Sequence, residues 1–166
     1  MKTLKNRSEI DDKYKWKLED IYENEELWEE DFKKTKELLA EIAGFKGKIN
    51  TSGNLLKVLK LDDQIGMILS KIFSYARMRR DEDNANARYQ SLTDRAMRLS
   101  IEAMSATSFI APEILSIDEQ KIRAMIDENE ELKIYKQYLE NLIRYKPHVL
   151  SPEEEKILAE AEILGE

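Results

Sequence analysis

The 166-residue sequence contains no cysteine, only one histidine, and few glycines and prolines. Without cysteine the chain forms no disulfides, offers no thiolate to a metal and has no cysteine nucleophile. With His148 as its only histidine, it lacks the two histidines, one helical turn apart, of the common zinc-hydrolase motif. Glycine and proline are too scarce to supply the many turns of a fold made of strands and tight turns.

Long apolar runs are also missing from the sequence. No stretch of about 18 apolar residues is available to span a bilayer, and the first residues lack the apolar segment of a secretory signal. We therefore expect a cytoplasmic protein. The 27 basic and 34 acidic residues leave a formal charge of -7, which repels phosphate backbones and anionic lipids. Nucleic acid and membranes are excluded as expected partners.

What the sequence does contain is a helical pattern of apolar and charged residues. Hydrophobic residues make up 42% of the chain and charged residues of both signs 37%, a balance typical of helices with one wet face. We predict an all-α fold, a bundle of about six helices built around a long antiparallel αα-hairpin. We expect residues 1–23 to form an aromatic arm packed on the body, and residues 24–166 to form a single helical domain.

The predicted hairpin bends within the stretch Tyr75–Tyr89. Three arginines end one long helical pattern, and an asparagine begins the next. Arginines near a helix C-terminus and acids before a helix N-terminus both complement the helix dipole. We place the bend near Asp81 to Asn84. The first long helix is expected to begin near Thr51 or Ser52, and Gly66 in its interior indicates close packing against a neighbour or a slight bend.

Capping residues and breakers predict the other helix boundaries. Asn24 is expected to cap the first helix, which Gly44 and Gly47 end. Pro112 is expected to break the chain after the second long helix, because proline disfavours helical geometry in the residue before it. The remaining expected features are a capping box at Ser116 and Glu119, a cap at Asn129, a stop at Pro147 and a last helix from Ser151.

The candidates for chemistry each have a simpler structural explanation. The acidic stretch Asp81–Asn86 resembles a calcium loop, but that reading places Ala85 at a ligand position and Leu92 where a bidentate glutamate belongs. His148 is interpreted as a structural or solvated loop residue, and the run Glu153–Glu155 as a solvated first turn. Tyr14 and its neighbours form an N-terminal staple, with a ligand-contacting aromatic patch as the alternative. We expect no catalytic, cofactor-binding or metal-binding residue.

Five stretches together carry a resemblance to a known family, and their order and spacing match. They are Tyr14–Tyr22, Tyr75–Met78 with Asp81–Asp83, Tyr89–Ala96, Ser108–Leu115 and Pro147–Ser151. The sequence resembles the N-terminal part of oligoendopeptidase F, in the zinc metallopeptidase superfamily that includes thimet oligopeptidase. It departs from the family pattern at Asp11, where proline is usual, and at Lys17, where an acid is usual.

The resemblance implies a fragment of a larger enzyme. The family's enzymes are several times longer, and their zinc site, H-E-x-x-H with a further glutamate, lies in the C-terminal half and is absent from this sequence. The implied role is a non-catalytic N-terminal helical domain that forms one wall of a narrow channel for oligopeptides. Its implied partners are the C-terminal catalytic part and an oligopeptide substrate. The alternative is a free-standing helical module that binds peptides or a protein without cleaving them.

A channel-wall domain without the rest of its enzyme is expected to expose apolar side chains to water, or to bury them in a dimer. The candidates in the sequence are Ile163 and Leu164, near the end of the last predicted helix.

Overall fold

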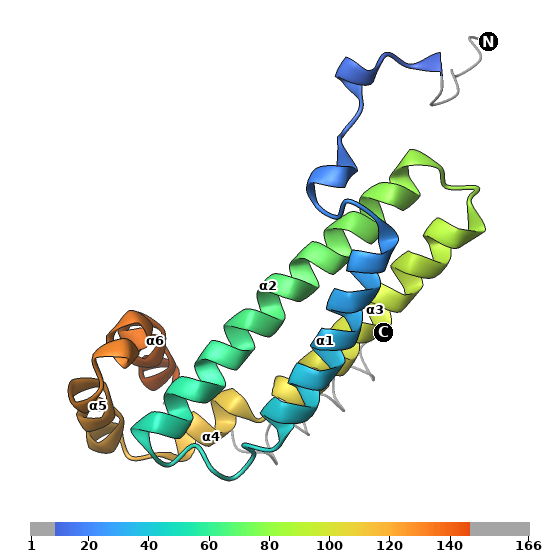
Figure 1. The fold of residues 1–166 in the computed structure, drawn as a ribbon. Helices are drawn as coiled ribbons and strands as arrows, with labels where there is room; N and C mark the ends of the chain where they lie inside the picture. The colour runs from blue at the N-terminus through green and yellow to red at the C-terminus, as the bar shows by residue number, and fades with distance from the viewer. Residues whose placement is uncertain (1–8, 147–166) are drawn as a thin grey trace, which may run out of the picture. The chain divides into compact units, whose positions relative to one another are not determined.

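The computed structural model describes residues 9–146, and all regular structure among them is helical (Figure 1). The elements are the 3-10 helices η2 (Asp12–Tyr14), η3 (Leu18–Asp20) and η4 (Glu130–Tyr135), and the α-helices α1 (Glu25–Ala43), α2 (Ser52–Glu82), α3 (Ala87–Thr107), α4 (Ile110–Ser116), α5 (Glu119–Glu128) and α6 (Lys136–Tyr145). The predicted all-α fold is confirmed. Pro147, His148 and the helix expected from Ser151 lie outside the described residues, so the total of six helices stays a prediction.

The described residues divide into two compact units. One contains residues 9–46 and 57–109, and the other contains residues 47–56 and 110–146. Most of α2 therefore belongs to the first unit and its first turn to the second. The single domain predicted over residues 24–166 extends beyond the described residues and stays a prediction.

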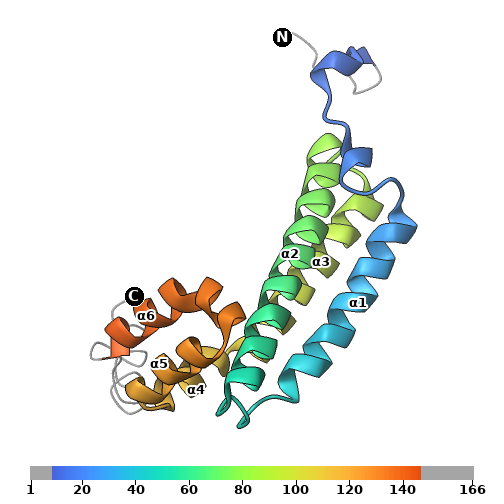
Figure 2. The same cartoon turned by 60° about the vertical axis from the view of Figure 1, so that its left-hand side comes forward.

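The first unit is organised by α1, α2 and α3, which lie side by side in both views (Figures 1 and 2). Asn24 caps α1 as expected, since its side chain accepts a hydrogen bond from the N–H of Leu27 at 3.0 Å. A short turn then reverses the chain between α2 and α3, and Asn86 caps α3 by accepting from the N–H groups of Arg88 and Tyr89. The hydroxyl of Thr93 also reaches the carbonyl oxygen of Ala76 across the two helices, at 3.1 Å.

The core of this unit is supplied by one face of each helix. The apolar positions repeat at spacings of three and four, so they fall on one side of a 3.6-residue helix and are buried together. Each fully buried large side chain contributes about 1.5–3 kcal/mol of transfer free energy. The buried residues include Trp28, Thr35, Leu39 and Ile42 of α1, Val58, Ile65, Ile72 and Tyr75 of α2, and Leu92, Ala96, Leu99 and Ala103 of α3.

In the second unit Glu113, which lies in the first turn of α4, binds a distant turn of the chain. Its two carboxylate oxygens accept hydrogen bonds from the backbone N–H groups of Gly47 and Ile49, each at 2.7 Å. Gly47 has a φ of 78°, a conformation that favours glycine. The carboxylate therefore fixes a turn more than 60 residues earlier in the sequence. Three buried side chains, Ile122, Met125 and Ile126, form the inner face of α5.

Three sequence expectations are corrected in the second unit. The predicted break after α3 is present at Ser108 and Phe109, but Pro112 does not cause it; Pro112 lies in the first turn of α4, where a missing N–H group is tolerated. The cap of α5 is Asp118 and not Ser116, because the Asp118 carboxylate accepts from the N–H groups two and three residues on. Asn129 does act as a cap, but the turn it begins is the 3-10 helix η4, and α6 follows at Lys136.

None of the helices within residues 9–146 is long and apolar enough to cross a membrane.

Candidate functional site

The acidic stretch considered as a calcium loop forms the turn between α2 and α3. Glu82 accepts a hydrogen bond from Arg79 at 3.2 Å, and Asp83 accepts one from the N–H of Ala85 at 3.1 Å. The acidic residues of this stretch thus stabilise the turn and the C-terminal end of α2. Within the described residues no group of three or more metal-ligating side chains is placed to hold an ion. The other two candidates, His148 and Glu153–Glu155, lie outside those residues.

The inner end of the N-terminal arm is packed against α2. Tyr22 is 2% exposed and meets Tyr75 edge to face, with ring centroids 5.4 Å apart. Its hydroxyl donates to the carboxylate of Asp31 at 2.6 Å, and the ammonium of Lys71 lies 4.0 Å from its ring centroid. Burial, and then the hydrogen bond to Asp31, raises the pKa of Tyr22 far above its ordinary value. This half of the arm is a structural staple.

Arg79 attaches the arm to α2 through a charged contact. Its guanidinium donates to Glu19 in the arm at 2.9 Å and lies 5.2 Å from the ring centroid of Tyr75. Burial by itself lowers the pKa of Arg79, but hydrogen bonds with Tyr75 and Glu19 outweigh it and the pKa is raised. Arg79 therefore stays charged and holds Glu19, whose own pKa is lowered by a backbone hydrogen bond and by Arg79.

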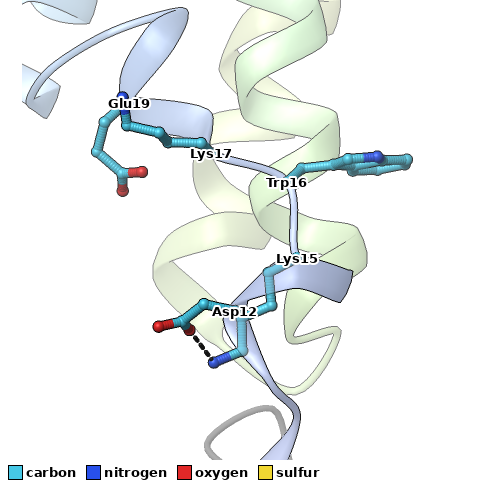
Figure 3. A pocket seen from close by; sticks show the side chains of 5 residues that line it. All are labelled: Asp12, Lys15, Trp16, Lys17 and Glu19. Carbon is cyan, nitrogen blue, oxygen red and sulfur yellow. Dashed lines mark hydrogen bonds and ion pairs between the residues drawn. The ribbon is translucent and has the colours of Figure 1, made fainter.

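The outer half of the arm presents aromatic side chains to solvent. Tyr14 is 76% exposed and Trp16 is 63% exposed. Trp16 borders a hollow of about 360 Å³, and Figure 3 shows that its ring and the Glu19 carboxylate extend in opposite directions in this view. Lys15 pairs with Asp12 there at 2.8 Å. Tyr14 and Trp16 thus lie exposed on the outer half of the arm, whereas Tyr22 is buried against the helices.

A second hollow, of about 510 Å³, lies between α2 and α3, and we call it the α2–α3 groove. Its lining residues are Asp62, Asp63, Ile65, Gly66, Met67 and Leu69 of α2 and Ser100, Ala103, Met104 and Thr107 of α3. Gly66, Ser100 and Ala103 are the small residues of this lining, and Met67 and Met104 are 69% and 71% exposed. Sequence reasoning missed this surface. The sequence feature that could have indicated this surface is the presence of methionines at helix positions next to the buried apolar stripe.

The charged residues that line the α2–α3 groove are acidic. Asp62 and Asp63 are among its lining residues. Burial raises the pKa of Asp62, and the neighbouring charge of Asp63 raises it further. A carboxylate whose charged form is disfavoured gains from a nearby cation, so this acidic part of the groove favours a positively charged group.

The structure overturns one of the two alternatives for Gly66, close packing against a neighbour, and leaves the slight bend a prediction. A Cβ atom built on this residue meets nothing within 4 Å, so no neighbour in the described part of the chain packs closely against it. The glycine instead faces open space in the α2–α3 groove.

Comparison with known proteins connects the chain with one family. The family model for oligopeptidase F matches residues 113–166. Oligopeptidase PepF of Bacillus subtilis is 42% identical over 164 residues, which cover 98% of this chain and 24% of that protein. Group B oligopeptidase PepB of Streptococcus agalactiae is 33% identical, over 96% of this chain and 27% of that protein. The chain thus spans about a quarter of the length of the curated relatives it matches.

Solved structures extend the likeness to the fold. A candidate peptidase from Chlamydophila abortus superposes with a TM-score of 0.78 at 26% identity, over 96% of this chain and 27% of that one. Oligoendopeptidase-F from Enterococcus faecium superposes with a TM-score of 0.69 at 27% identity, over 84% of this chain and 27% of that one. The chain is therefore related to the oligoendopeptidase F family and corresponds to the N-terminal region of these proteins.

Proposed function

We propose that this chain serves as the non-catalytic N-terminal helical region of an oligoendopeptidase F-type zinc metalloendopeptidase, where it forms part of the wall of the oligopeptide channel. The observation that carries the proposal is the match of 98% of the chain to 24% of a bacterial oligopeptidase. A region related over its whole length to part of a peptidase is expected to act as part of one.

In this proposal the zinc and its catalytic groups belong to the remaining part of the polypeptide. That part would supply the H-E-x-x-H ligands of a zinc ion, which would provide Lewis-acid chemistry for peptide hydrolysis. In this proposal the chain contributes the shape of the channel wall. The 31 residues of α2 extend on the order of 45 Å at 1.5 Å per residue. Close packing of α1 and α3 beside most of α2 makes a stiff surface suited to lining a channel.

A hybrid protein tests the proposal. The region of the Bacillus subtilis relative matched by this chain is replaced by the chain itself, and cleavage of fluorogenic oligopeptides is measured. We expect zinc-dependent cleavage of short peptides by the hybrid, little cleavage of folded proteins, and no cleavage by the isolated chain. The control is the same hybrid with one H-E-x-x-H histidine replaced by alanine. A folded but inactive hybrid, or zinc-dependent turnover by the isolated chain, would count against the proposal.

The second candidate is a free-standing helical module that binds peptides or a protein without cleaving them. It is favoured by the exposed rings of Tyr14 and Trp16, since aromatic residues are common contact residues in binding surfaces. Sequencing the DNA downstream of the Glu166 codon separates the two candidates. An in-frame continuation that reaches H-E-x-x-H supports the peptidase region, and an immediate stop codon supports the module.

A further inference from the structure

We propose that the α2–α3 groove seats a helix from the remaining part of an oligoendopeptidase F-type polypeptide, with the backbone of that helix close to Gly66. The inference rests on the proposed function, because the longer polypeptide supplies the occupant. The α2–α3 groove would then be an interface inside the longer polypeptide.

Exposed apolar side chains mark the α2–α3 groove and the adjoining face of α3. Met67 on α2 and Met104 on α3 are 69% and 71% exposed, and Ile101 is 59% exposed. On α3 the exposed positions Met97, Ile101 and Met104 are spaced by four and three residues, so they lie along one helical face. Such a stripe beside a buried core face is typical of a helix that packs on both sides.

Gly66 indicates what kind of surface approaches the groove. Glycine inside a helix costs about 1 kcal/mol relative to alanine, and nothing within 4 Å of its Cβ position accounts for it here. Across the groove are the small side chains of Ser100 and Ala103. Small residues on facing helices let a third backbone approach closely. The groove therefore fits the packed side of another helix, with Met67 and Met104 as flexible apolar edges.

Charge argues against a second copy of this chain as the occupant. In a two-fold symmetric dimer the same patch lies on both subunits, so Asp62 and Asp63 of each copy would approach those of the other. The formal charge of -7 adds to this repulsion. A helix of different sequence, with a basic residue placed near Asp62 and apolar residues over the methionines, avoids that repulsion.

The source of such a helix follows from the length of the relatives. This chain covers 24% and 27% of two curated relatives, and 27% of the Enterococcus faecium structure that shares its fold. Most of each relative therefore lies outside the matched region. The α2–α3 groove, with its exposed methionines and its two aspartates, is where we place the packing of that part.

Methionine oxidation measures the proposed contact directly. The isolated chain and the Bacillus subtilis hybrid are treated with hydrogen peroxide, and sulfoxide formation is followed by mass spectrometry of peptides. We expect Met67 and Met104 to react about tenfold more slowly in the hybrid than in the isolated chain. Met125, which is 4% exposed, is the control and should react slowly in both.

A pair of glycine substitutions tests the close approach. Gly66 and Gly53 both lie in α2, and neither has an atom within 4 Å of its Cβ position. In the isolated chain we expect Gly66→Leu and Gly53→Leu each to leave the melting temperature unchanged or raised. In the hybrid we expect only Gly66→Leu to lower it, because the added side chain enters the helix-packing site.

The outcomes separate this inference from the proposed function. An active hybrid in which Met67 and Met104 react as fast as in the isolated chain overturns the inference and leaves the proposed function standing. An inactive hybrid with both methionines protected supports the inference and counts against the proposed function. An isolated chain found by light scattering to be a dimer that Gly66→Leu dissociates makes a second copy the occupant and overturns the inference.

If the hybrid does not fold, the full-length Bacillus subtilis relative takes its place. Leucine is introduced at the positions aligned with Gly66 and with Gly53. A lower melting temperature at the Gly66 position alone supports the inference, and equal effects at both positions overturn it.

Discussion

The indole Nε1–H of Trp28 donates a hydrogen bond to the backbone carbonyl oxygen of Ile72, 3.0 Å away, and so joins α1 to α2. Both residues are fully buried. The Trp28 ring also stacks on Phe32, with centroids 5.2 Å apart, and the guanidinium of Arg95 lies 4.9 Å from its centroid. One side chain thus connects three helices.

Trp28→Phe is expected to lower the free energy of unfolding by about 2 kcal/mol, because it removes the bond to Ile72 and part of the buried volume. Urea unfolding followed by far-UV circular dichroism measures the change. Trp16→Phe is the matched control, since Trp16 is 63% exposed and its replacement should alter stability by less than about 0.5 kcal/mol. Equal losses for the two variants would contradict the assigned role of Trp28.

Glu113→Gln is expected to destabilise the second unit by about 1–3 kcal/mol. The amide places an NH2 donor where an oxygen accepts from Gly47 or Ile49, so either the exposed N–H of Gly47 or the part-buried N–H of Ile49 loses its charged acceptor. Hydrogen exchange measures the effect, with faster exchange expected at those two amides. Glu119→Gln, at an exposed ion pair with Arg123, is the control and should cost under about 1 kcal/mol. Unchanged exchange at Gly47 and Ile49 in Glu113→Gln would refute the prediction.

The pair of Glu29 and Arg95 is expected to make stability depend on pH in the acidic range. Two hydrogen bonds, at 2.5 and 2.6 Å, let Arg95 hold the pKa of Glu29 below its ordinary value. A carboxyl group with a lowered folded-state pKa stabilises the fold above its unfolded pKa of about 4.3. That contribution is lost as the pH falls through the folded-state pKa.

We therefore expect Arg95→Gln to raise the pKa of Glu29 toward its ordinary value, as followed by carboxyl carbon NMR. The difference in unfolding free energy between the parent chain and the variant should shrink as the pH falls from 6 toward 3. Because both side chains are partly exposed, the charge contribution should be no more than about 1 kcal/mol. Arg98→Gln, at an exposed position of the same helix, is the control. A Glu29 pKa that does not move in Arg95→Gln would show that the ion pair is absent in solution.

Helix identity and several boundaries were predictable from the sequence because their causes are local. Asn24 caps α1 through the amide three residues on, and Asn86 caps α3 in the same way. The buried stripe of α2 follows from apolar residues repeating at helical spacing. Local rules failed at Ser116, where the nearby Asp118 competes for the same helix end and makes the capping bonds instead.

The sequence by itself determined that this protein is helical, where α1, α2 and α3 begin and which protein family it resembles, since these depend on neighbouring residues and on motif order. Only the tertiary structure decided which groups meet. The partners of Trp28 and Glu113 lie 44 and more than 60 residues away along the chain, and the open space around Gly66 exists only once α2 and α3 lie together. No sequence spacing encodes such contacts, because they depend on how whole helices pack against one another.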